Sequence, residues 1–262
     1  MREKLRKQRA IKLSADEKVF AAISYLTIGF FALACLIPFY LVVIGSFTNE
    51  KWILTKGYAF FLTGKNFSIS GYKTVFQDAH SIASAYGITI FVTIVGTFLS
   101  ILITTMTGYV LSRQSFPWRN QLAFFYFFTT LFSGGLVPWY LLCTKYLKFT
   151  NHIYSLIIPG LFSVWNMIIS KSFMKGIPAE LVESAKVDGA SEYLIYFKLM
   201  LPLSKPLLAT LSLFTALGYW NDWYNCMMFM TDREKWNLQF TLQNILSSVE
   251  ALTEIANKTG IQ

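Results

Sequence analysis

Four long stretches without Asp, Glu, Lys or Arg, and a fifth interrupted only by Asp222, constrain what this 262-residue chain can fold into. They are residues 19–49, 81–112, 120–144, 149–170 and 206–231. An α-helix rises ~1.5 Å per residue, so about 20 apolar residues cross a hydrocarbon layer of ~30 Å. The pattern therefore predicts an all-α polytopic membrane protein with five transmembrane helices.

The composition agrees with this class. Hydrophobic residues make up 54% of the chain and charged residues 14%, whereas a soluble domain carries about 25% charged residues. The formal net charge of +9 alone is compatible with nucleic-acid binding, but the apolar runs exclude it and indicate a lipid bilayer as the surrounding medium. The first run is too long for the ~7–15-residue apolar core of a signal peptide, so we expect a retained helix.

The distribution of basic residues predicts the orientation. Of the 23 Lys and Arg residues, 14 lie in segments 1–18, 113–119 and 171–205. Since basic residues concentrate in cytoplasmic loops, the N-terminus is expected inside and the C-terminus, after five crossings, outside. The predicted organisation is a basic cytoplasmic segment (1–18), a first transmembrane helix with an outer loop (19–80), and a permease core (81–262).

Signatures of catalysis and of metal binding are missing from the sequence. It has no phosphate-binding loop, no H-E-x-x-H and no G-x-S-x-G, and its three cysteines have no metal-ligand spacing. Asp222 is the single acidic residue in a predicted span, while a secondary transporter or pump needs several ionisable groups there. We therefore expect no enzyme activity, cofactor or metal in this chain, and an energy source in another subunit.

Segment 176–206 predicts a helical elbow between the fourth and fifth spans. Pro178 suits the first position of a short helix, and Asp188-Gly189 suits its end. Ser191 can cap a second short helix, which Pro202 breaks. A small, apolar elbow on the cytoplasmic side suits docking into a groove on another protein.

The same segment resembles the loop signature of ABC-importer permeases, E-A-A-x-x-D-G-A…L-P-L-x-x-P. The matching residues are Glu183, Ala185, Asp188, Gly189, Ala190, Leu201, Pro202, Leu203 and Pro206. The sequence departs at Ser184, where the family commonly has Ala, and at Tyr196, where Phe is usual.

The wider chain is similar to the carbohydrate branch, the maltose-type second permease, and to Gram-positive oligo- and polysaccharide permeases. The similar segments are Phe67-x-x-x-Gly71-Tyr72, residues 91–97, residues 133–138 and Trp220-Asn221-x-Trp223. Permeases of this family have a sixth span that is expected to be missing here, through an incomplete or a truncated chain.

The resemblance implies a permease subunit of an ATP-driven importer for a carbohydrate, an oligosaccharide, in a bacterial cell membrane. The implied partners are a second homologous permease, two nucleotide-binding ATPase subunits that hold ATP and Mg, and an external solute-binding protein. Its implied coupling residues are Glu183, Ser184, Ala185, Asp188, Gly189, Ala190 and Pro202. Alternatives are a non-sugar solute, or an ATP-independent carrier or channel, and Asp188-Gly189 could be a helix C-cap alone.

Two further regions leave alternatives open. The cluster Tyr219, Trp220, Asn221, Asp222 and Trp223 suits a saccharide path, in which aromatic faces stack on sugar rings, or an interfacial aromatic belt. Gly134, Gly135 and Pro138 interrupt the third span and suit a gate hinge or a close helix crossing. No residue reports the identity, length or linkage of the sugar.

Overall fold

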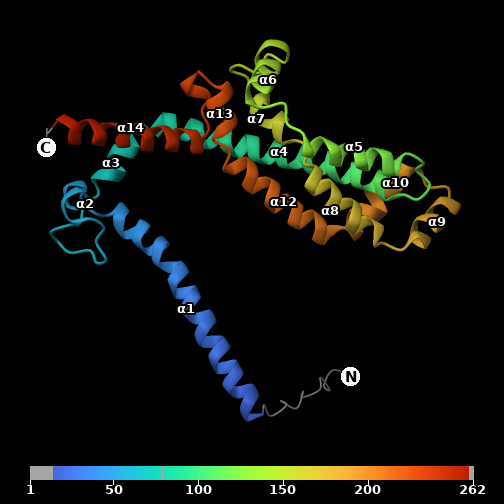
Figure 1. Ribbon diagram of the computed structural model, residues 1–262, viewed down its shortest axis with the longest axis horizontal. Coiled ribbons are helices and arrows are strands. Elements are labelled where there is room, and N and C mark those ends of the chain that lie inside the picture. The colour runs from blue at the N-terminus through green and yellow to red at the C-terminus, as the bar shows by residue number, and fades with distance from the viewer. Residues whose placement is uncertain (1–13, 78, 260–262) are drawn as a thin grey trace. The chain divides into compact units, whose positions relative to one another are not determined.

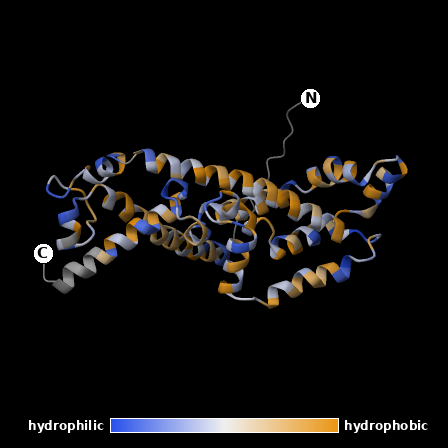
Figure 2. Ribbon diagram, turned by 90° about the horizontal axis from the view of Figure 1, so that it is seen from above, coloured by the Kyte–Doolittle hydropathy of each residue, from blue (hydrophilic) through white to orange (hydrophobic). Residues whose placement is uncertain are grey.

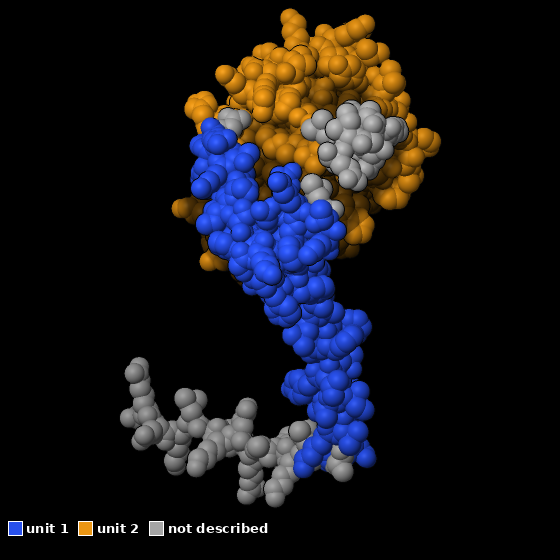
Figure 3. Space-filling model, turned by 90° about the vertical axis from the view of Figure 1, so that its left-hand side faces the viewer, with its two compact units in different colours: residues 1–79 blue, residues 80–262 orange. Residues whose placement is uncertain are grey.

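The computed structural model describes residues 14–77 and 79–259, and the predicted all-α fold is confirmed. These residues contain no named strand, and their β-bridge is an antiparallel pair between Thr48 and Phe67. The chain divides into two compact units, residues 1–79 and 80–262 (Figure 3). Residues 1–13 of the predicted basic segment 1–18 lie outside the described residues.

Unit 1 is built around α1 (Ala15–Ser46), a helix of 32 residues. At its start the Glu17 carboxylate accepts the backbone N–H of Ser14 at 2.8 Å, as in a capping box. The most apolar window of α1 has no buried residue, which suits a helix surrounded by hydrocarbon or by partner helices. The helices α2 (Glu50–Lys56) and α3 (Ser70–Gln77) follow.

Unit 2 is organised around α4 (Ala79–Ser112), an unbroken helix of 34 residues (Figure 1). At ~1.5 Å per residue, α4 is about 51 Å long and exceeds the ~30 Å hydrocarbon layer. Its buried face carries small and hydroxyl residues at intervals of four or seven, namely Thr89, Gly96, Ser100 and Thr104. Small residues let neighbouring helices approach closely in a membrane.

Three bent helix pairs follow α4, of which the first two cover predicted apolar runs and the third joins elbow residues Glu192–Leu203 to α12. The elements are α5 (Arg119–Leu131), α6 (Leu136–Leu141), η1 (Leu142–Tyr146), α7 (Tyr154–Ile157), η2 (Ile158–Gly160), α8 (Val164–Lys175), α10 (Glu192–Ile195), η3 (Tyr196–Met200), α11 (Leu201–Leu203) and α12 (Lys205–Trp220). The bend is 112° between α5 and α6–η1, 51° between α7–η2 and α8, and 82° between α10–α11 and α12.

Two helices of the described chain are long and apolar enough to cross a membrane alone, and up to five spans result if each bent pair counts as one. The number of candidate spans in the described chain is therefore two to five, and it equals the predicted five if each bent pair is one span. Backbone chemistry explains the first two breaks, because Gly135 has a φ of +85° and Pro159 lies in η2. Figure 2 shows hydrophobic residues along the length of the long helices.

The remaining described elements are α9 (Ala179–Val187), α13 (Tyr224–Phe229), η4 (Arg233–Lys235) and α14 (Leu238–Thr259). α14 lies in the predicted outer segment 232–262, for which the sequence predicted no helix. Although it has 22 residues, α14 is not apolar enough to count among the candidate spans.

Asn151 fastens the loop before α7 to the loop after α13. Its Oδ1 accepts the backbone N–H groups of Thr231 at 2.8 Å and Asp232 at 3.0 Å. Its Nδ2 donates to Thr231 Oγ1 at 2.8 Å, and its carbonyl accepts from Lys235 Nζ at 3.2 Å. Asn151 has a φ of +60°, which Asn adopts more readily than most residues.

The two ends of α4 contact different parts of unit 2. Near its start, Thr89 Oγ1 accepts the backbone N–H of Leu238 at 2.9 Å. Near its end, Tyr109 Oη donates to Glu192 Oε2 at 2.5 Å. The elbow and the 232–238 loop therefore lie at opposite ends of α4, and the assignment of the elbow end to the cytoplasm stays a prediction.

Candidate functional site

Segment 176–206 forms the predicted elbow, with α9 as its first arm. The helix ends at Asp188, and Gly189 follows with a φ of +80°. The Gly189 N–H donates to the Lys186 carbonyl at 3.0 Å, and the Ala190 N–H to the Ala185 carbonyl at 2.9 Å. These two bonds form a Schellman motif, which favours glycine at the left-handed position. The C-cap role of Asp188-Gly189 is thus present in the structure.

Within this chain, glycine at position 189 is required by the backbone conformation. A Cβ atom at Gly189 would meet nothing within 4 Å, so no group of this chain crowds the position. The positive φ is what requires glycine there. Pro178 differs from expectation, because it has an extended backbone with ψ of 131° and precedes the first helical residue, Ala179.

The second arm of the elbow begins at Ser191, whose Oγ accepts the Leu194 N–H at 3.3 Å. An ion pair of 2.5 Å between Lys186 Nζ and Glu192 Oε1 joins the two arms. Both side chains are about half exposed, and exposed ion pairs contribute only about 0–1 kcal/mol. The ion pair therefore orients the arms more than it stabilises them.

The inner side of the elbow packs on α4 and α8 through one buried cluster. Its members are Tyr109, Met174, Val182, Ile195, Tyr196, Met200, Leu207 and Leu211. Two hydrogen bonds orient the elbow on α4. One runs from Tyr109 Oη to Glu192, and the other, of 2.7 Å, joins Thr105 Oγ1 and Tyr196 Oη. Arg113 lies over the Tyr109 ring at 4.6 Å. The elbow is therefore bound to the end of α4 by apolar and polar contacts together.

The outer side of the elbow is open. The structure leaves Glu183, Ser184, Asp188, Gly189 and Pro202 exposed among the predicted coupling residues, while Ala185 and Ala190 are half-buried against the inner cluster. Val187, at the end of α9, is 88% exposed. The family signature does not include Val187, so sequence reasoning did not select it.

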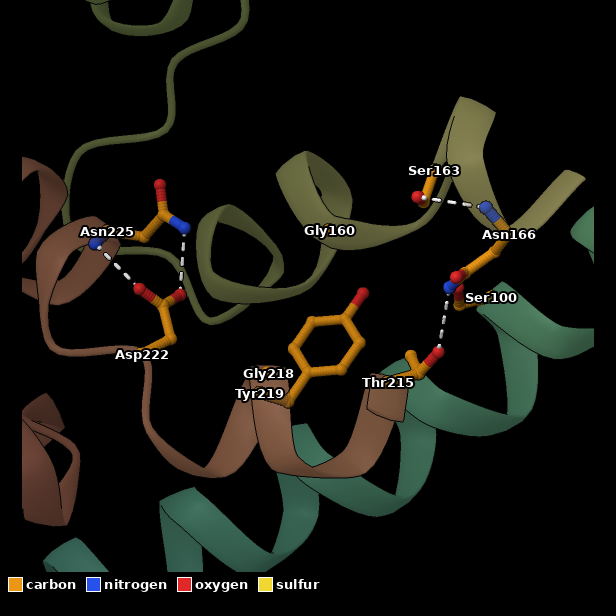
Figure 4. Close-up of a pocket in the computed structure, with 9 residues that line it drawn as sticks. All are labelled: Ser100, Gly160, Ser163, Asn166, Thr215, Gly218, Tyr219, Asp222 and Asn225. Carbon is orange, nitrogen blue, oxygen red and sulfur yellow. Dashed lines mark hydrogen bonds between the residues drawn. The ribbon is translucent and has the colours of Figure 1, made fainter. Parts of the chain in front are cut away.

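A cavity of about 360 Å³ lies between α4, the break before α8, α12 and α13 (Figure 4). Its lining residues are Ser100, Gly160, Ser163, Asn166, Thr215, Gly218, Tyr219, Asp222 and Asn225. Hydroxyls and amides dominate this lining, and it contains one carboxylate. Within the described part of the chain, no group of three or more His, Cys, Asp and Glu residues could hold a metal ion.

Tyr219 is held rigidly in the wall of this cavity. Its hydroxyl donates to the Ile157 carbonyl at 2.8 Å. Cβ atoms at Gly96 and Gly160 would lie 2.6 and 2.9 Å from its ring, so both positions must be glycine for the ring to fit. With 6% of its surface exposed, Tyr219 offers little ring face for stacking on a sugar, which is the role that the saccharide-path alternative gives it.

Asp222 lies just after the end of α12, at the break before α13. Its Oδ1 accepts the Asn225 N–H at 3.1 Å, and its Oδ2 accepts Asn225 Nδ2 at 2.8 Å. Its backbone carbonyl accepts from Asn237 Nδ2. The predicted acidic residue of the fifth run therefore faces a polar, partly enclosed site.

The other residues predicted for a substrate path lie outside the cavity lining. Trp220 is half-buried, Trp223 is 39% exposed, and Asn221 Nδ2 donates to the Leu217 carbonyl at 2.9 Å. Sequence reasoning missed the polar lining residues Ser100, Ser163, Asn166, Thr215 and Asn225. The available sequence signal was that these polar residues lie in or next to apolar runs. Such a position indicates a shared site only when the packing of the runs is known.

The predicted hinge lies at the break between α5 and α6. Gly135 precedes α6 with a φ of +85°, and its N–H donates to Ser133 Oγ at 3.2 Å. Cβ atoms at Gly134 and Gly135 would meet nothing within 4 Å. Within the described residues, these glycines therefore bend the chain and do not make a close helix crossing. Pro138 follows inside α6.

Comparison with known proteins finds a family match over a range that contains the elbow and most of the cavity lining, but not Ser100 and Asn225. Residues 104–224 match the family described as binding-protein-dependent transport system inner membrane component. Protein LplC of Bacillus subtilis (strain 168) is 36% identical over 228 residues, covering 87% of this chain and 76% of LplC. The polygalacturonan/rhamnogalacturonan transport system permease protein YtcP of the same organism is 36% identical over 229 residues, covering 87% and 79%.

A solved structure has the same fold. It is the crystal structure of a bacterial ABC transporter involved in the import of the acidic polysaccharide alginate. One of its chains superposes with a TM-score of 0.80 and 26% sequence identity, covering 94% of this chain and 88% of that one.

Proposed function

Because this chain belongs to the family of binding-protein-dependent transport system inner membrane components, we propose that it is a permease subunit of an ATP-driven importer for an oligosaccharide. It is an integral membrane protein and a transport component. The observation that carries the cargo class is the 36% identity with YtcP over 87% of this chain, since YtcP is named for polygalacturonan and rhamnogalacturonan.

The proposed complex sits in a bacterial cell membrane. It contains a second homologous permease and two ATPase subunits, which bind ATP and Mg, and it receives cargo from an external solute-binding protein. In this proposal, the outer side of the elbow docks into a groove on one ATPase subunit. The exposed Val187 and the acidic Glu183 and Asp188 support this role, because an apolar contact with a polar rim is typical of a protein interface.

The arrangement of α4 supports a mechanical link between docking and transport. Tyr109 and Thr105 hold the elbow to one part of α4, and Ser100 of the same helix lines the cavity. An unbroken helix transmits displacement along its axis, so closure of the ATPase pair would move the elbow and the cavity wall together. This is a rigid-body route from ATP binding to a change in access.

Val187→Asp tests the docking role. The charge lies on an exposed position, so the fold should persist, while an apolar contact with the ATPase should be lost. We expect weaker co-purification of the ATPase subunit and loss of ATP-dependent uptake, and Val187→Thr is the matched control with a similar shape. Normal assembly and uptake with Val187→Asp would refute docking through this surface. Gly189→Asp is less selective, because it also disturbs the positive φ.

The same reconstituted complex separates the alternative functions. Uptake of saccharide that needs ATP supports the proposal. ATP-dependent uptake of a different solute class would replace the oligosaccharide with a non-sugar cargo. Flux without any ATPase subunit would instead identify an ATP-independent carrier or channel.

A further inference from the structure

A second cavity, of about 180 Å³, lies between the end of α4, the end of α8 and the helix α9 of the elbow. Its lining contains three cationic side chains, those of Arg113, Lys175 and Lys186, and one carboxylate, that of Glu183. Positive charge therefore exceeds negative charge in a partly enclosed space, which raises the local concentration of anions. This cavity, which we call the basic pocket, has the chemistry of an anion site.

Arg113 is fixed in position, yet its hydrogen-bond donors are largely unused. Its guanidinium lies over the Tyr109 ring at 4.6 Å, and Nη2 donates to Met200 Sδ, a weak acceptor, at 3.3 Å. In the part of the chain that the structure describes, Arg113 Nε is buried without a hydrogen-bond partner. A buried unpaired donor calls for an acceptor, and the planar fork of arginine matches two oxygens of a phosphate group.

The two lysines are also available to an anion. Among the described residues, the Lys175 side chain forms no ion pair. Lys186 pairs with Glu192, but both side chains are about half exposed, and exposed pairs are weak. Gln114 and Ser115, exposed in the loop after α4, add neutral donors to the lining. The basic pocket thus combines an arginine fork, two mobile charges, an amide and a hydroxyl.

The basic pocket lies at the depth of lipid headgroups. The charge-free run 81–112 ends where α4 ends, at Ser112, and the run 149–170 ends five residues before the end of α8 at Lys175. In the loop that follows α4, Trp118 is 62% exposed, and tryptophan is enriched at the membrane–water interface. Basic pockets between the ends of membrane helices bind the headgroups of anionic lipids.

We propose that the basic pocket binds the phosphate group of an anionic phospholipid, and that the bound headgroup stabilises the elbow against α4 and α8. Arg113 would contact two phosphate oxygens, while Lys175 and Lys186 balance the charge. The volume of about 180 Å³ is below the ~300–1,000 Å³ of ordinary ligand pockets, so it suits part of a headgroup. The depth favours a lipid over a free phosphate ion, because the acyl chains of a lipid hold its headgroup at this level.

The test uses the protein purified in detergent with the subunits that accompany it, after removal of native lipid. Binding of labelled phosphatidylglycerol is compared with that of labelled phosphatidylcholine, whose choline group cancels the phosphate charge. We expect phosphatidylglycerol to bind about fivefold or more tightly. A separate arm measures binding of radioactive inorganic phosphate without lipid, and we expect none that saturates.

Two exposed lining residues allow substitutions that spare the packing. Lys175→Gln removes one cation, and Gln114→Glu adds a carboxylate of the same shape. Each should weaken binding of phosphatidylglycerol about fivefold, with thermal unfolding in lipid-free detergent unchanged. The matched controls are Lys198→Gln and Gln121→Glu, exposed residues outside the lining, which should bind as the unchanged protein does. Added phosphatidylglycerol should raise the unfolding temperature of the controls more than that of the two pocket variants.

Each outcome supports or refutes the lipid site. If Lys175→Gln and Gln114→Glu bind phosphatidylglycerol as tightly as their controls, the site is refuted. Equal binding of the two lipids would refute the preference for an anionic headgroup. If inorganic phosphate binds the unchanged protein but not Gln114→Glu, while lipid binding is equal in both, the pocket holds a free phosphate and the lipid is refuted. None of these measurements uses transport, so their result does not depend on the function proposed above.

Discussion

Tyr109 donates a hydrogen bond of 2.5 Å from its hydroxyl to the Glu192 carboxylate, and this bond joins the end of α4 to the second arm of the elbow. Ser100 lies nine residues earlier on α4, or about 14 Å along the helix axis. One continuous helix therefore connects the proposed docking element to the wall of the cavity. Substitutions at this junction should affect both stability and coupling.

Tyr109→Phe should remove the hydrogen bond and keep the ring in place. The ring packs on Tyr196 at 5.5 Å and under Arg113, so the loss is confined to the hydroxyl. We expect a destabilisation of about 1 kcal/mol and a lower ratio of transport to ATP hydrolysis. Thermal unfolding of the purified complex and parallel uptake assays measure the two effects. Tyr193→Phe is the stability control, since Tyr193 is 72% exposed, and equal unfolding of both variants would contradict the prediction.

Gly189→Ala should destabilise the elbow through its backbone alone. A β-carbon meets no neighbour at this position, but the φ of +80° disfavours an L residue by about 1–2 kcal/mol. Gly189→Asn should have a smaller effect, because Asn tolerates the left-handed region. Hydrogen exchange at Gly189 and Ala190 reports the opening of the motif. Equal protection in the Ala variant and the unchanged chain would show that the motif does not depend on glycine.

Gly96→Ala should disturb the packing around the Tyr219 ring. The new methyl group would lie 2.6 Å from the ring, and such overpacking destabilises by about 1–3 kcal/mol. Gly87→Ala, on the same helix with open surroundings, should be neutral or should stabilise by up to about 1 kcal/mol. The difference between the two unfolding temperatures is the measurement, and a difference near zero would mean that Tyr219 adjusts freely.

Asn151 should be sensitive both to loss of its side chain and to a change of backbone preference. Asn151→Gly loses three side-chain hydrogen bonds but accommodates the φ of +60°. Asn151→Ala loses the same bonds and adds strain, so it should be the less stable variant by about 1 kcal/mol. The rate of limited proteolysis between residues 147 and 153 compares this loop in the two variants. Faster cleavage of the Gly variant would contradict this ranking.

Sequence reasoning predicted the fold and the elbow because both depend on local patterns. Long charge-free runs predict membrane helices, and Asp188-Gly189 predicts a helix end, without knowledge of what packs nearby. It did not predict the three broken spans in detail, since a bend angle depends on what the two halves pack against. The breaks at Gly134-Gly135 and near Pro202 were the parts of this pattern visible in the sequence.

The cavity could not be predicted from the sequence for a related reason. Ser100, Asn166 and Thr215 are each isolated polar residues within apolar helices, and only the packing of three helices brings them together. Tyr219 was selected as an aromatic surface, but the glycine notches at Gly96 and Gly160 that enclose its ring come from distant segments. Sequence reasoning therefore selected a residue that lines the cavity, whereas the enclosure of its ring depends on tertiary contacts.

The Schellman motif at Gly189 and Ala190 preorganises the elbow for the docking proposed above. Its hydrogen bonds connect residues no more than five positions apart, so its shape is established within the segment before any partner arrives. A partner that binds it has little backbone conformational entropy to remove, and more of the contact energy appears as affinity. Loosening this corner should therefore weaken association even where every contacting side chain is retained.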